Sequence, residues 1–159
     1  MSTPALPTVP QKDGSRALTI CASLIIAALY IVGIESHGIV RHVVQTAPIW
    51  PCVVLALRRS EWSKWTALPC FLFWFSVMAL IWLFLLGLAH VFSGDFTPIE
   101  IVLTLVIGLC SVLGVVAAVR MKTHVGAIGA SAAFCGILLL QLLALRISFL
   151  PAIAHDRWR

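Results

Sequence analysis

Charged residues are scarce in this chain. Asp, Glu, Lys and Arg make up only 11% of its 159 residues, whereas soluble globular domains contain about 25%. Hydrophobic residues account for 61%, and the mean hydropathy is +1.05. This composition excludes a water-soluble domain and predicts an integral membrane protein. Because each span needs about 20 residues, we expect a single all-α, polytopic membrane helix bundle.

Motifs for catalysis and for metal binding are also missing. The sequence contains no GxSxG, no HExxH, no CxxC and no glycine-rich phosphate loop. Its five cysteines lie far apart within apolar segments, which is typical of packing residues rather than of a disulfide framework. The basic residues occur in small groups and form no continuous stripe, so a nucleic-acid partner is not expected. We therefore expect no enzymatic activity and no metal site.

Five apolar segments predict the membrane spans. They lie at about 17–34, 37–57, 67–91, 98–119 and 125–150, so that the bundle occupies residues 16–151. Residues 1–15 are rich in Pro, Ser and Thr and are expected to form a disordered tail. Residues 152–159 are expected to form a short second tail.

The topology depends on whether residues 37–57 cross the membrane. If they do, seven basic residues share one face: Lys12, Arg16, Arg58, Arg59, Lys64, Arg120 and Lys122. Four lie on the other: Arg41, Arg146, Arg157 and Arg159. Because basic residues near span ends are retained in the cytoplasm, this division favours five spans in the cell (inner) membrane. The N-terminus is then cytoplasmic and the C-terminus external.

The second span, within ESHGIVRHVVQTAPIWPC, is the most unusual. Pro48 and Pro51 each lack a backbone donor and crowd the preceding turn, which predicts a broken or kinked helix. The backbone carbonyls freed by the break must then accept hydrogen bonds from nearby groups. We expect the side chains of Arg41 and Gln45 to donate these bonds. The break either lines a site or is a simple packing kink.

Polar side chains gather near the external ends of the predicted spans. This outer-face cluster comprises Glu35, His37, Arg41, Gln45, Glu100 and Arg146. Glu100 and Arg146 would lie at similar depth in antiparallel helices, which predicts an ion pair. His42 and His90 come from different spans near the same face and could ligate a b-type haem; otherwise no cofactor is expected.

Small residues indicate where helices approach closely. Gly126, Gly129, Ala130, Ala133 and Gly136 would form a packing surface on the last span. With packing surfaces but no specific site motif, the leading hypothesis is a non-catalytic accessory, assembly or interaction subunit of a membrane complex. Its partners would be the lipid bilayer and other membrane subunits or further copies of the chain. The alternatives are a haem-binding electron carrier and a small oligomeric transporter or channel.

Overall fold

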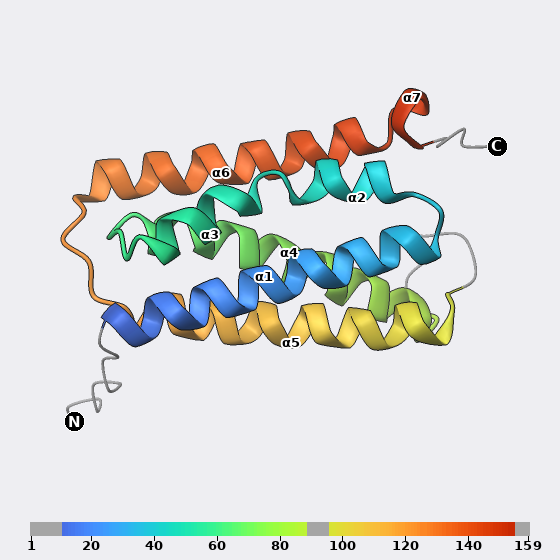
Figure 1. The fold of residues 1–159 in the computed structure, drawn as a ribbon, viewed down its shortest axis with the longest axis horizontal. Helices are drawn as coiled ribbons and strands as arrows, with labels where there is room; N and C mark the ends of the chain where they lie inside the picture. Colours follow the sequence, from blue (N-terminus) through green and yellow to red (C-terminus); the bar gives the residue numbers. More distant parts are fainter. Residues whose placement is uncertain (1–10, 89–95, 155–159) are drawn as a thin grey trace.

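A computed structural model describes residues 11–88 and 96–154, which form helices and no strand. The helices are α1 (Gln11–Glu35), α2 (Ile39–Thr46), α3 (Ile49–Leu57), α4 (Ser63–Leu85), α5 (Pro98–Arg120), α6 (Ala127–Ser148) and α7 (Pro151–Ala154). Figure 1 shows the long helices side by side along the long axis of the molecule. The predicted all-α polytopic bundle is confirmed.

Four helices, α1, α4, α5 and α6, are each long and apolar enough to cross a membrane. The pair α2 and α3 meets the same criterion together, with a bend of 52° between its halves. In Figure 1 this pair runs the length of the bundle beside α1 and returns the chain to the end where α1 began. The arrangement therefore supports four to five spans, the fifth being the broken one.

The core lies where α1 and α4 meet the other helices. Helix α1 packs against α5, α3 and α2, while α4 packs against α5, α6 and α3. The largest fully buried apolar side chains in the described residues include Phe71, Leu18, Ile25 and Ile107. The outer faces are also apolar, since Leu109 and Leu139 are 62% and 66% exposed. A bundle that is apolar both inside and outside fits a bilayer environment.

Several predicted boundaries differ from the observed ones. Helix α1 begins at Gln11, within the segment expected to be a disordered tail, and α7 occupies part of the predicted C-terminal tail. Helix α4 ends at Leu85 rather than near residue 91. Gly87 stops it with φ +73°, while the Leu88 amide donates to the Leu83 carbonyl at 2.8 Å. This glycine-terminated Schellman motif is a strong helix stop.

The first polar residue of the second predicted segment, His37, lies in the turn between α1 and α2, outside the helices. His37 adopts the left-handed conformation, with φ +52°, and the Gly38 amide donates to the Gly33 carbonyl at 2.8 Å. Glu35 and His37 are exposed there. The second span therefore begins at Ile39 rather than at residue 37.

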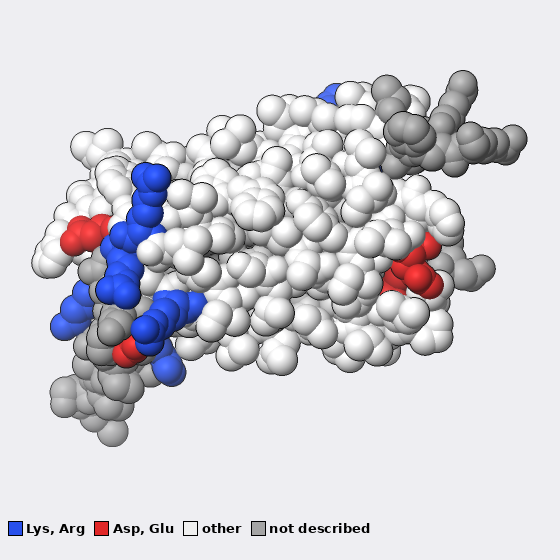
Figure 2. Space-filling model, in the orientation of Figure 1, with Lys and Arg blue, Asp and Glu red and all other residues white. Residues whose placement is uncertain are grey.

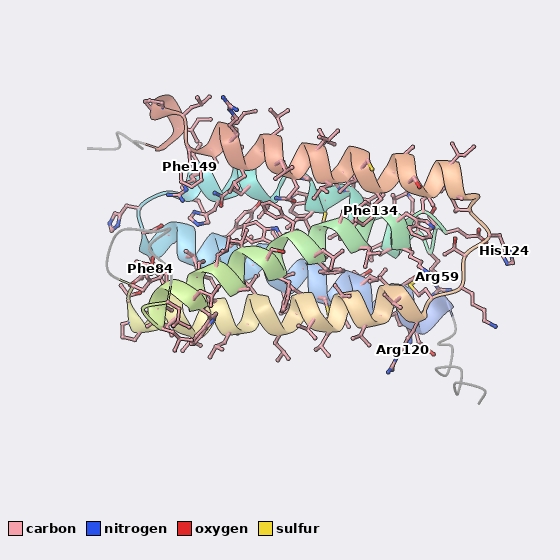
Figure 3. The ribbon with its side chains drawn as sticks, turned by 180° about the vertical axis from the view of Figure 1, so that it is seen from behind. Arg59, Phe84, Arg120, His124, Phe134 and Phe149 are labelled. Carbon is pink, nitrogen blue, oxygen red and sulfur yellow. The ribbon has the colours of Figure 1, made fainter. Side chains whose placement is uncertain are left out.

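Charge is distributed unequally between the two ends of the bundle. Figure 2 shows most Lys and Arg side chains gathered at one end, which we call the basic end. Its described basic residues are Arg16, Arg58, Arg59, Lys64, Arg120 and Lys122. Figure 3 places Arg59, Arg120 and His124 there and Phe84 and Phe149 at the opposite end. The sequence-based division of charges thus corresponds to a real separation in space.

Hydrogen bonds join the two connections at the basic end. Lys64 Nζ donates to the Met121 carbonyl at 2.9 Å, which satisfies a group at the carboxyl end of α5. The His124 amide donates to a Glu61 carboxylate oxygen at 3.0 Å. These contacts fix the start of α4 relative to the α5–α6 connection.

Candidate functional site

The break between α2 and α3 is built around Pro48. Pro48 is buried and immediately precedes α3; it cannot donate to the Val44 carbonyl, which accepts instead from the Ala47 amide at 3.3 Å. Pro51, by contrast, is exposed and lies in the first turn of α3. Helical N–H groups have no intrahelical partner in that turn, so proline fits there without breaking the helix. Pro48 alone therefore occupies the bend.

Side chains from neighbouring helices meet the carbonyls near the break. Gln141 Nε2 of α6 donates to the Gln45 carbonyl at 2.9 Å, whose donor in a continuous helix would be the residue 49 amide. Cys70 Sγ contacts the Pro48 carbonyl at 3.6 Å. The expected compensation is present, but its donors are Gln141 and Cys70 rather than Arg41 and Gln45.

Gln45 instead uses its side chain to hold α6. Its Nε2 donates to Ser148 Oγ at 2.9 Å, and both residues are buried. Gln141 and Ser148 are seven residues apart and share one face of α6. Together the two glutamines and Ser148 form what we call the glutamine clasp between α2 and α6.

Arg41 lies at the edge of the same region. Its guanidinium carbon is 4.2 Å from the centroid of the Phe149 ring, which is a cation–π contact. Its Nε is buried and has no hydrogen-bond partner in the described residues. The aromatic ring therefore holds the guanidinium in place but leaves one donor unused.

A cavity of about 120 Å³ opens beside α2, between α1, α4, α5 and α6. We call it the Trp74 cavity. Its polar lining consists of Arg41, His42, Gln45, Trp74, Glu100 and Thr104. Its apolar lining includes Leu29, Val32, Val77, Ile81, Ile107 and Leu145. Such a lining, apolar with a few polar groups, is typical of ligand sites.

The cavity offers both hydrogen-bond donors and acceptors. Trp74 is only 2% exposed, and its Nε1 has no partner in the described part of the chain. His42 Nδ1 lies 3.0 Å from the Gly38 carbonyl; because a carbonyl only accepts, Nδ1 carries the hydrogen and Nε2 of the neutral ring is an acceptor. Buried polar groups are rarely left unpaired, so these donors are available to a molecule bound in the cavity.

Glu100 is held at this cavity by the start of α5. Its carboxylate accepts from the Thr97 amide at 2.8 Å, and Thr97 Oγ1 accepts from the Glu100 amide at 3.2 Å. This is a capping box, and the T-x-x-E spacing in the sequence could have revealed it. The cap uses one carboxylate oxygen, and Glu100 is also one of the residues that line the cavity.

The structure brings together only part of the predicted outer-face cluster. Arg41, Gln45 and Glu100 line the Trp74 cavity with His42, whereas Glu35 and His37 lie in an exposed turn. Arg146 is exposed on α6, and α4 lies between α5 and α6. The predicted Glu100–Arg146 ion pair is therefore wrong, because their helices do not pack against each other.

The structure tests the predicted packing surface but not the predicted haem ligands. His90 lies outside the described residues, so the haem hypothesis stays untested, and the described residues hold no group of three or more potential metal ligands. In the small-residue surface, Ala130 is buried and a Cβ on Gly129 would meet Trp62 at 3.0 Å. A Cβ on Gly126 or Gly136 would meet nothing within 4 Å. That surface is only partly used for packing.

Sequence reasoning missed three residues of this region: Trp74, Gln141 and Ser148. Gln141 carried a usable signal, because it is a lone amide in an apolar segment and such groups face the bundle interior. Nothing distinguished Trp74 from the other tryptophans.

The chain matches no family model, no curated protein and no solved structure. Function must therefore be argued from the Trp74 cavity itself.

Proposed function

We propose that this chain is a non-catalytic, multi-pass membrane protein that binds a small molecule in the Trp74 cavity, as a small transporter or binding subunit does. The observation that carries the proposal is the pair of buried donors, Trp74 Nε1 and Arg41 Nε, left without protein partners at the cavity. A buried, unsatisfied donor costs about 1–3 kcal/mol. A bound molecule that accepts these hydrogen bonds would recover that energy.

The position of the cavity supports this function. It lies beside a broken span, and broken helices in transporters accompany binding sites. Arg41, His42 and Glu100 are ionisable groups within the bundle, and intramembrane ionisable groups are costly to maintain. Glu100 caps α5 and also lines the cavity.

The leading sequence hypothesis, an accessory or assembly subunit, remains compatible with ligand binding. Its support is the outer face of α6, where Cys135 and Gly136 are exposed. An oligomer or a larger complex could use that face, and the haem-carrier hypothesis remains a separate prediction. The orientation we propose places the basic end in the cytoplasm, because basic residues are retained there.

The test removes the indole N–H donor of Trp74 and keeps an aromatic side chain at that position. We expect Trp74→Phe to lose a small molecule that co-purifies with the wild-type protein, measured by native mass spectrometry from mild detergent. Trp50→Phe is the matched control, because Trp50 is 47% exposed and lies outside the cavity lining. Retention of the molecule in Trp74→Phe, or no bound molecule in the wild type, would contradict the proposal.

A further inference from the structure

A second hollow lies on the outer surface of the bundle between α4 and α5. This open groove of about 440 Å³ is lined by Phe75, Trp82, Leu105, Gly108, Leu109 and Val112 among others. Phe75, Leu105 and Leu109 are 45%, 54% and 62% exposed. In a bilayer those side chains contact lipid, so the groove is open to hydrocarbon. We call it the α4–α5 groove.

The α4–α5 groove adjoins the Trp74 cavity, and Met78 lies between the two spaces. Met78 and Thr104 line both, so the two spaces share a wall at the same depth in the bundle. Met78 is nearly buried, at 4% exposed, and its unbranched side chain has three rotatable bonds. Rotation of this one side chain would connect a polar interior site with the lipid-facing surface.

Gly108 determines the depth of the groove. A Cβ built there would meet only Met78 Cβ, at 3.8 Å, which is an ordinary van der Waals distance. Close packing of α4 and α5 therefore does not require a glycine at this position. The glycine instead leaves room for an apolar chain to lie between the two helices.

The polar lining indicates the charge of the group that the cavity holds. Arg41 and Glu100 are groups of opposite formal charge, so the lining has no excess of either sign when the His42 ring is neutral. A charged head would leave an uncompensated charge in a poorly solvated place, which is costly. An uncharged head is the better match, with an oxygen that accepts from Trp74 Nε1 and a hydroxyl that donates to His42 Nε2 or Glu100.

We infer that the ligand is an uncharged, single-chain amphiphile of the membrane, with its hydroxyl- and carbonyl-bearing head in the Trp74 cavity and its hydrocarbon chain in the α4–α5 groove. This inference rests on the proposed function and specifies its ligand. The cavity alone, at about 120 Å³, is smaller than the roughly 300–1,000 Å³ of typical ligand pockets. Addition of the groove brings the site into that range.

A photoreactive monoacylglycerol with a diazirine in its chain provides the probe. The full-length protein is reconstituted in phosphatidylcholine nanodiscs, irradiated with the probe and digested for mass spectrometry. We expect labelling on residues 75–82 of α4 and 105–112 of α5. Gly108→Leu should reduce that labelling roughly tenfold, because its side chain fills the space of the lipid chain.

The control is Gly136→Leu, which makes the same replacement in α6 where a Cβ meets nothing within 4 Å. It should leave the labelling unchanged. Leu105→Trp fills the groove from its exposed side and replaces Gly108→Leu if that variant unfolds at a lower temperature than wild type. Unchanged labelling in the groove-filling variants would overturn the inference.

A photoreactive fatty acid of the same chain length tests the head group. It should label the groove more weakly, and stronger labelling than by the monoacylglycerol would overturn the assignment of an uncharged head. If neither probe labels the groove while Trp74→Phe still loses a bound molecule, this inference fails and the proposed function stands. If Trp74→Phe retains the molecule, the proposed function itself fails.

Discussion

Two glycines of α5, Gly108 and Gly114, have opposite roles in the packing of α5 against α4. A Cβ on Gly114 would lie 2.6 Å from Phe71 ring atoms, whereas a Cβ on Gly108 would meet only Met78 Cβ, at 3.8 Å. Phe71 is 1% exposed and has nowhere to move. Gly114 therefore permits the close contact of α4 and α5, while Gly108 maintains an open groove.

We expect Gly114→Ala to destabilise the bundle by about 1–3 kcal/mol, the usual cost of overpacking a core. Gly108→Ala should be neutral or stabilising, since alanine favours helix over glycine by about 1 kcal/mol. Thermal unfolding of both variants in the same detergent measures the difference. Equal stability of the two would show that α4 and α5 are not packed as described.

At the scale of elements, the glutamine clasp fixes the broken span against α6. Gln45 Nε2 donates to Ser148 Oγ, and Gln141 Nε2 donates to the Gln45 carbonyl. A straight helix would not need the Gln141 contact, because the residue 49 amide would donate to the Gln45 carbonyl. The clasp therefore stabilises the bend that Pro48 introduces, and α6 becomes one wall of the Trp74 cavity.

A double-mutant cycle on Gln45→Met and Ser148→Ala should give a coupling free energy of about 0.5–1.5 kcal/mol, in the range found between membrane helices. The control cycle combines Gln45→Met with Ser76→Ala, since Ser76 Oγ donates to the Leu72 carbonyl of its own helix and not to α2. The control losses should be additive. Additive losses in the first cycle would mean that the clasp contributes no stability.

The helices were largely predictable from the sequence, whereas which helices pack against each other was not. Long apolar segments give α1, α4, α5 and α6, because a span must satisfy its own backbone in lipid. The end of α4 at Gly87 was missed, although a glycine at that position is a helix-stop signal. Glu100 and Arg146 were paired wrongly because equal depth does not reveal which helices touch. Trp74 was missed because only packing decides which tryptophan faces a cavity.

For the whole molecule, the two ends differ in chemistry. The basic end carries most of the described basic residues (Figure 2), while the Trp74 cavity lies toward the opposite end with Arg41 and Glu100. This polarity depends on α2 and α3 forming one broken span. If the pair turned back instead, Arg58 and Arg59 would lie on the same side as His37, and the separation of charge would be lost.

Cysteine labelling across the broken span tests this central claim most directly. Ser36→Cys lies in the turn before α2 and Ser60→Cys in the connection after α3, in a Cys135→Ala background because the other four cysteines are buried. We predict that a membrane-impermeant maleimide labels Ser36→Cys in intact cells, and Ser60→Cys only after permeabilisation. The reverse pattern would contradict the proposed orientation alone. Labelling of both positions from one side would contradict the broken span and the five-span bundle.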